Sequence, residues 1–170
     1  MAVSGVIMGK MEVKGLEDVQ TMLSRMGANT EAIIKAGIYD GAGVIASAVA
    51  DALEAMPTDS GPITSAHQVM RGPLLIQKEG LKRGFGISKM RTDEGFINVK
   101  IGFDGYNDLR TKKYPNGQPN VLIARSIESG TSYMQKTPFV RQSVNKSKKK
   151  AIDAVQARVS KAAREIAERK

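Results

Sequence analysis

Apolar residues recur with helical spacing over a long stretch in the first third of the chain. Between residues 30 and 56 they follow one another at steps of three, four and seven positions: Ile34, Ile38, Ile45, Val49, Leu53 and Met56. Such steps place side chains on one face of a helix. We therefore predict one long helix over about 30–56, ended by Pro57. Its middle is rich in glycine and alanine, which we attribute to close approach by another backbone.

A second apolar stripe predicts a long helix at the C-terminal end, over about 138–168. Thr137 and Pro138 form a favourable start, because threonine caps helices and proline at the first position sacrifices no hydrogen bond. The stripe, which is interrupted at Lys148, consists of Val140, Val144, Ile152, Val155, Val159, Ala163 and Ile166.

Two shorter helices are predicted from the same kind of spacing. One covers residues 16–26, and Gly27 follows it in the position that favours glycine after a helix. The other follows Asn120, its predicted N-cap, and ends at Gly130. Their apolar residues are Leu16, Val19, Leu23 and Met26 in the first, and Leu122, Ile123 and Ile127 in the second.

Alternation of apolar and polar residues identifies the clearest strand, in the segment GFINVKIGFDG. Short apolar pieces at 74–76 and 81–87, and a weak alternation at 9–14, are further strand candidates. The polar, turn-rich segments 57–73 and 104–120 are predicted loops, the second with a turn at Asn116-Gly117. In the clearest strand, Ile97, Val99, Ile101 and Phe103 point one way and Asn98 and Lys100 the other.

This order of elements predicts an α+β fold. A small antiparallel sheet is packed by one long central helix and a long C-terminal helix, with a short N-terminal helix beside them. We expect an α+β core domain over 1–140. A basic amphipathic helix over 138–170 is expected to pack on that core or to extend from it.

Composition limits the kinds of chemical site that the protein can contain. The chain has 170 residues, 41% of them hydrophobic, and no cysteine, which excludes disulfides, thiolate metal ligands and cysteine nucleophiles. We expect no signal peptide at the start of the sequence, and no stretch that reaches the roughly 18 apolar residues of a membrane span. The net charge of +9 is concentrated at the C-terminal end, where residues 141–170 hold 10 basic and 3 acidic side chains.

Two sequence patterns that are found in enzymes are only weak evidence for cofactor binding or catalysis in this chain. The segment GAGVIA at 41–46 matches a dinucleotide-binding pattern, but it lies within the predicted long helix, where its backbone N–H groups are already bonded. His67 is the only histidine, and it lies in a polar loop near Asp59, Ser60 and Ser65 without a motif that would orient it. We expect no enzyme activity, no cofactor and no metal site.

The basic residues of the last helix are the other candidate site. They could contact phosphates or an acidic partner, or form a solvated helix face. No aromatic residue is interleaved with them, which weakens a nucleic-acid interpretation without removing it. They are Lys148, Lys149, Lys150, Arg158, Lys161 and Arg164.

Three pieces of the sequence together resemble a known family. Gly15-Leu16 follows the first predicted strand, and EGLKRGFGI lies in mid-chain at 79–87. A pattern A-x-x-x-E-x-G-T then leads to P-F-x-x-x-S and the closing helix, at Ala124, Glu128, Gly130, Thr131, Pro138, Phe139 and Ser143. The chain thereby resembles the minor tail, or tail-completion, proteins that join head and tail in long-tailed bacteriophages and prophages.

The resemblance implies a non-enzymatic virion protein of the neck or tail, assembled in the host cytoplasm. Its subunits would form a ring, expected to be hexameric, between the head connector or stopper protein and the tail tube protein. Weak contact with genomic DNA in the channel, and none with a membrane, is also implied. Glu128, Gly130, Thr131, Pro138 and Phe139 would contact a partner or position the last helix. A nucleic-acid-binding module acting through that helix is the alternative.

Overall fold

The computed structural model describes residues 30–59, 69–93 and 95–168 of the chain. In this part, helices and short antiparallel strands pack together as an α+β fold, as predicted. The predicted strand at 9–14, the predicted helix at 16–26 and His67 lie outside the described residues.

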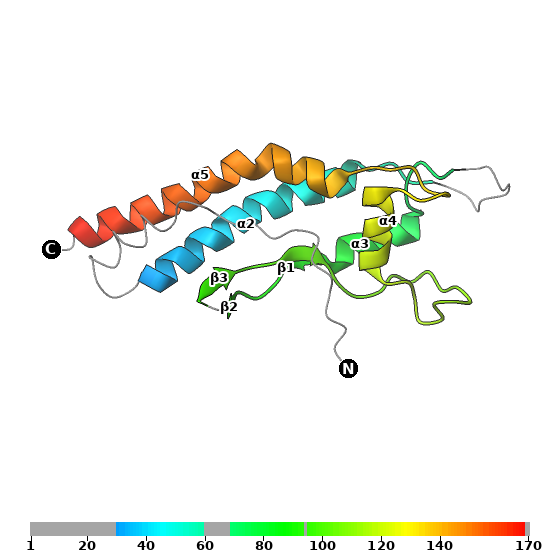
Figure 1. The fold of residues 1–170 in the computed structure, drawn as a ribbon, viewed down its shortest axis with the longest axis horizontal. Helices are drawn as coiled ribbons and strands as arrows, with labels where there is room; N and C mark the ends of the chain where they lie inside the picture. The colour runs from blue at the N-terminus through cyan, green and yellow to red at the C-terminus, as the bar shows by residue number, and fades with distance from the viewer. Residues whose placement is uncertain (1–29, 60–68, 94, 169–170) are drawn as a thin grey trace.

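Two long helices form the body of the molecule. Helix α2 covers Thr30–Ala55 and helix α5 covers Phe139–Glu168. They run side by side in opposite directions along the long axis (Figure 1). Both were predicted to within a residue at each end.

Over its first half, the buried face of α5 lies one position before the predicted stripe, whereas Val155, Val159 and Ala163 are buried as predicted. Val140, Val144 and Ile152 are only half-buried. Two serines complete the buried face, and the hydroxyl of Ser147 is satisfied by donating to the carbonyl oxygen of Ser143 at 2.7 Å. The buried residues follow a strict four-residue spacing: Phe139, Ser143, Ser147, Ala151, Val155, Val159 and Ala163.

Glycine permits the close approach of α2 to α5 at one position. A Cβ atom on Gly37 would lie 3.4 Å from both Cγ1 and the carbonyl oxygen of Val155. The predicted close contact is therefore confirmed at Gly37. It is wrong at Gly43, where an added Cβ would meet nothing within 4 Å.

The strands form two small ladders instead of one continuous sheet. Strand β1 (Phe85–Ile87) pairs antiparallel with β4 (Ile101–Phe103). Strand β2 (Arg91–Asp93) pairs antiparallel with β3 (Phe96–Asn98). The predicted strand is thus split at residues 99–100. Its alternation is confirmed at Val99 and Phe103, which are buried, whereas Ile97 and Ile101 are half-buried like Asn98 and Lys100.

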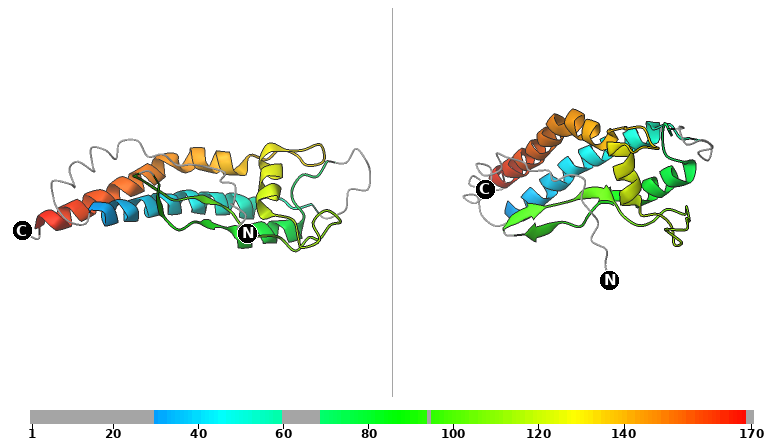
Figure 2. Two further views of the ribbon diagram at one scale, coloured as in Figure 1. Left: turned by 60° about the horizontal axis from the view of Figure 1, so that its bottom comes forward. Right: turned by 45° about the vertical axis from the view of Figure 1, so that its right-hand side comes forward.

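Helix α2 is the middle layer, with α5 on one side and the strands on the other (Figures 1 and 2). One apolar cluster joins Ile34 and Ile38 of α2 to Val155 of α5 and to Val99 between the ladders. A second cluster lies nearer the other end of α2. It includes Leu53, Leu81, Phe103, Ile127, Met134 and Phe139. Because α5 contributes to both clusters, it packs on the core along its length.

Two short helices close that end of the molecule. Helix α3 covers Leu75–Gly84 and helix α4 covers Asn120–Ser129. Helix α4 was predicted, but α3 was not. The strand candidates at 74–76 and 81–87 are wrong over 75–84, which is α3, and right at 85–87, which is β1. The fully buried Leu81 of α3 packs in the second cluster, and a Cβ on Gly80 would lie 2.3 Å from Cβ of Asn107. Tertiary contacts therefore stabilise a helix whose own sequence is mostly polar.

Asn120 is not the N-cap that we predicted. It lies inside the first turn of α4, buried, and its side-chain amide donates to the carbonyl oxygen of Asp104 at 2.8 Å. Its backbone N–H donates to the carbonyl oxygen of Gly105 at 3.0 Å. Asn120 therefore anchors the start of α4 to the end of β4.

Helix α2 corrects the expectation that no segment could span a membrane. By length and composition alone it could, with a mean hydropathy of 1.4 over its most apolar window. In the structure 44% of that window is buried inside the protein. A core helix passes the same test, and the apolar residues of α2 pack against α5 and the strands.

Candidate functional site

The candidate site lies where α4 turns into α5, a segment that we call the corner and that covers residues 128–139. Gly130 ends α4 with φ 74° and ψ 163°. These angles are accessible essentially to glycine alone. Its N–H donates to the carbonyl oxygen of Ser126 at 2.9 Å.

The carboxylate of Glu128 caps the N-terminus of α5. One oxygen accepts from the N–H of Val140 at 2.9 Å, and the other from the N–H of Arg141 at 3.1 Å. The first N–H groups of a helix have no partner within the helix, and the helix dipole favours an anion there. Glu128 supplies both a partner and the charge. The cap predicted for Thr137 is therefore supplied by a residue on the preceding helix.

Backbone hydrogen bonds hold the turn of the corner. Thr131 and Met134 exchange bonds of 2.9 and 3.3 Å, and the N–H of Thr137 reaches the carbonyl oxygen of Ile127 at 2.8 Å. Met70, from the segment before α3, donates to Tyr133 at 2.9 Å and accepts from Gln135 at 2.8 Å. The corner is thus tied both to α4 and to a distant segment.

Phe139 anchors the far side of the corner. It is only 4% exposed, and its ring meets that of Phe103 edge-on with 6.0 Å between centroids. The ring centroid of Phe103 in turn lies 5.0 Å from that of Phe85. Pro138, half-buried, precedes this anchor. Helix α5 is therefore fixed at its first residue by a buried aromatic contact and by the cap.

The structure brings together the five residues that we predicted for this segment, but their surroundings differ. Glu128, Gly130, Pro138 and Phe139 position α5, whereas Thr131 is exposed on the turn. Partner contact by these residues stays a prediction.

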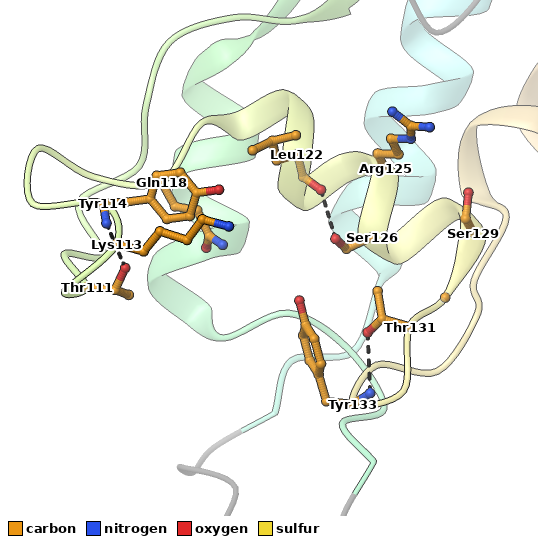
Figure 3. A pocket seen from close by; sticks show the side chains of 11 residues that line it. Thr111, Lys113, Tyr114, Gln118, Leu122, Arg125, Ser126, Ser129, Thr131 and Tyr133 are labelled. Atoms are coloured by element: carbon orange, nitrogen blue, oxygen red, sulfur yellow. Dashed lines mark hydrogen bonds between the residues drawn. The ribbon is translucent and has the colours of Figure 1, made fainter.

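Beside the corner lies an open groove of about 500 Å³, which we call the corner groove (Figure 3). Its walls are the loop after β4, the outer face of α4 and the turn of the corner. The lining is Thr111, Lys113, Tyr114, Gln118, Leu122, Arg125, Ser126, Ser129, Gly130, Thr131 and Tyr133.

The corner groove has a positive lining with no carboxylate. Arg125 is exposed, and among the described residues it forms no ion pair. The ammonium of Lys113 lies 5.5 Å from the ring centroid of Tyr114. The sequence did contain a signal for this groove: a cation and a tyrosine precede the recognised motif at Lys113 and Tyr114, and another pair lies within it at Arg125 and Tyr133, where the motif leaves the residue variable.

The basic residues of α5 lie apart from the corner groove, along the exposed side of the helix. Lys148, Lys149 and Lys150 are exposed, as are Lys161 and Arg164. Arg158 lies 3.5 Å from a carboxylate oxygen of Asp40 on α2. This predicted set is therefore a row of charges and not an enclosed pocket, and one of its members already has an acidic neighbour.

In the part of the chain that the structure describes, the shifted pKa values belong to one ion pair at the surface. A hydrogen bond from Lys82, together with its charge, lowers the pKa of Glu54, and the same hydrogen bond raises the pKa of Lys82. This pair is exposed and joins α2 to α3 at 2.9 Å. No group of three or more His, Cys, Asp or Glu among those residues could hold a metal ion.

The chain matches no protein-family model, no curated protein and no solved structure.

Proposed function

We propose that this protein is a non-enzymatic structural subunit of the neck or tail of a long-tailed bacteriophage. As one subunit of a ring, expected to be hexameric, it completes the tail or joins the tail tube to the head connector. The observation that carries the proposal is the corner: the recognised residues Glu128, Gly130, Pro138 and Phe139 act together on α5.

A rigid corner is suited to this role. A ring subunit must hold its contact surfaces in fixed orientations, because each neighbour is placed by the same rotation. Bonds from Glu128 and burial of Phe139 fix the direction in which α5 leaves α4. The proposed partners are further copies of the chain, the head connector or stopper protein, and the tail tube protein.

Electron microscopy of particles from a phage that lacks this gene tests the proposal. Filled heads beside separate tails are expected, and supplying the gene from a plasmid should restore joined particles. Supplying the Glu128→Ala variant should restore fewer of them. Intact virions without the gene would contradict the proposal.

A second candidate function is nucleic-acid binding through α5. It is favoured by the exposed Lys148, Lys149 and Lys150, which have no acidic partner among the described residues. Binding by lysines to phosphates releases counterions and weakens steeply with salt.

The discriminating measurement is DNA affinity at several salt concentrations. If this function holds, changing the three lysines to glutamine reduces the salt slope by about 0.9 per lost phosphate contact. Changing Lys35, Lys89 and Lys112, which lie elsewhere on the surface, serves as the control for net charge. Equal slopes for both triple variants would argue against a site on α5.

A further inference from the structure

We infer that the β2–β3 hairpin of one copy of this chain docks into the corner groove of a second copy. The inference rests on the proposed ring function, because it names the two surfaces through which neighbouring subunits meet.

The outer side of the hairpin has little cover from the residues that the structure describes. Phe96 is 75% exposed, more than any other large apolar side chain among the described residues. All three residues of β2 are exposed, and the ladder has only three residue pairs. A two-stranded hairpin alone is marginally stable in water, and exposed aromatic residues are typical anchors of protein interfaces. An occupant that covers Phe96 would stabilise this element.

A carboxylate lies beside the exposed ring. Asp93 is directly opposite Phe96 in the ladder. One of its oxygens accepts from the side-chain amide of Asn98 at 2.9 Å, which fixes the carboxylate while leaving its second oxygen for a partner. The end of the hairpin therefore presents an aromatic ring and a negative charge together.

The corner groove offers the complementary groups. Arg125 and Lys113 supply positive charge without an opposing carboxylate in the lining, and either cation can donate a charge-assisted hydrogen bond to the second oxygen of Asp93. The half-exposed ring of Tyr133 and the side chain of Leu122 supply apolar surface for Phe96. A cation over the face of a phenylalanine ring adds a further attraction. Charge and apolar surface thus favour the same occupant.

The two surfaces lie apart along the molecule. Figure 1 shows the hairpin beneath the N-terminal half of α2, whereas α4 lies at the opposite end of that helix. Because α4 contributes Leu122, Arg125 and Ser126 to the lining, the corner groove lies at that end too. Two different surfaces on one chain make a heterologous contact, which repeats from copy to copy and closes into a ring when the rotation permits. A contact between identical surfaces would instead stop at a dimer.

Directed cross-linking of the full chain tests this contact. The chain has no cysteine, so introduced cysteines report on one pair of positions only. Arg91→Cys on β2 and Ser129→Cys in the groove lining leave Asp93, Phe96, Lys113 and Arg125 unchanged. Under oxidation, a protein carrying both changes is expected to form a ladder of covalent multimers. The matched control combines Arg91→Cys with Ser160→Cys, which is exposed on α5, and is expected to remain largely uncrosslinked.

Charge exchange gives a second measurement, by sedimentation velocity across a range of concentrations. Asp93→Arg or Arg125→Asp alone should weaken self-association by about tenfold or more, and the two changes together should restore it. Phe96→Ser should weaken it as well.

The outcomes separate this contact from the proposed function. Rings or multimers that form without the 91–129 cross-link, and that tolerate both charge reversals, would overturn the docking inference and leave the ring proposal intact. Absence of any self-association would overturn the docking inference too. If Arg125→Asp abolished binding of a head or tail protein but not self-association, the groove would belong to that other partner. Intact virions in the phage lacking the gene bear on the function alone.

Discussion

At the scale of single residues, Glu128 links α4, on which it lies, to the start of α5, and its position in the sequence does not reveal this contact. Its carboxylate accepts from two N–H groups at the start of α5. Replacing Glu128 with alanine leaves both groups without this partner, and we expect the free energy of unfolding to fall by about 0.5–2 kcal/mol. Urea unfolding measures this change. Glu165→Ala, at an exposed position on α5, should change the free energy of unfolding by less than about 0.5 kcal/mol. Equal effects of the two substitutions would show that the cap contributes nothing.

Two phenylalanines with opposite degrees of burial allow a direct comparison of their substitutions. Phe139 is 4% exposed and Phe96 is 75% exposed. Phe139→Ala should lower the free energy of unfolding by about 3–5 kcal/mol, because it removes a buried ring and leaves a cavity. Phe96→Ala should change it by less than about 0.5 kcal/mol. Denaturant unfolding under conditions in which the protein is monomeric distinguishes them. A loss below 1 kcal/mol for Phe139→Ala would contradict its role as an anchor.

Two glycines are expected to respond to alanine in opposite directions. At Gly130 the backbone has φ 74°, and an added Cβ would lie 2.9 Å from Cβ of Lys136. Gly130→Ala should therefore destabilise the protein by about 1–3 kcal/mol. At Gly43, inside α2, an added Cβ meets nothing within 4 Å, so Gly43→Ala should stabilise by about 0.4–1 kcal/mol. Thermal unfolding of both variants checks the signs, and a shift of both in one direction would refute the assignment.

At the scale of single residues, the predictions from the sequence failed mainly at polar residues. Asn120 has the composition of a helix cap, but only the fold reveals that its amide meets the carbonyl group of Asp104. Ser143 and Ser147 were assigned to no face, because serine is polar and does not mark an apolar stripe. Ser147 is buried nonetheless, since its hydroxyl donates to the carbonyl oxygen of Ser143. Glu128 was singled out through a motif, and its partners on α5 could not be identified without coordinates.

At the scale of elements, long helices were predictable and short elements were not. The stripe of α2 specified its bounds almost completely, since apolar spacing over seven turns leaves few alternatives. Helix α3 has few apolar residues, and its helical state depends on contacts of Gly80 and Leu81 with residues distant in sequence. The split between β3 and β4 also follows from a distant partner. The N–H of Lys100 bonds the hydroxyl of Ser88 at 2.9 Å, where a regular ladder would use a carbonyl group.

An exposed ion pair joins α2 to α3 and predicts a pH dependence. Because Lys82 lowers the pKa of Glu54, this carboxylate contributes stability above its unfolded pKa, and the contribution is lost as the pH falls through the folded value. Wild type should therefore melt above the Glu54→Gln variant at pH 7 in low salt. The difference should shrink as the pH falls below the ordinary pKa of glutamate and vanish once the pH is below the lowered pKa of Glu54. It should also vanish in about 1 M salt, where exposed charges are screened. Asp51→Asn, also exposed on α2, is the control and should show no such pattern.

At the scale of the whole molecule, the C-terminal helix belongs to the core. We predicted that it would pack on the core or extend from it, and α5 supplies buried residues to both apolar clusters. A chain ending after Ser147 would lose Ala151, Val155, Val159 and Ala163 and expose Ile34 and Ile38 of α2.

Such a truncated chain is expected to lose its cooperative unfolding transition, because each of these residues packs against α2 or the strands. Circular dichroism during urea titration measures the transition. A chain carrying Lys148→Gln, Lys149→Gln and Lys150→Gln controls for the lost charge and should unfold as sharply as wild type. If the truncated chain also unfolds sharply, residues 1–140 form an independent domain.

The bonds of Glu128 also bear on the order in which the chain folds. They join residues 12 and 13 positions apart, whereas the pairing of α2 with α5 joins residues such as Gly37 and Val155 from the two ends of the described chain. Closing a short loop costs less conformational entropy than closing a long one. The corner should therefore form early and direct the growing α5 back along α2, so that substitutions at Glu128 slow folding while those at Val155 mainly speed unfolding.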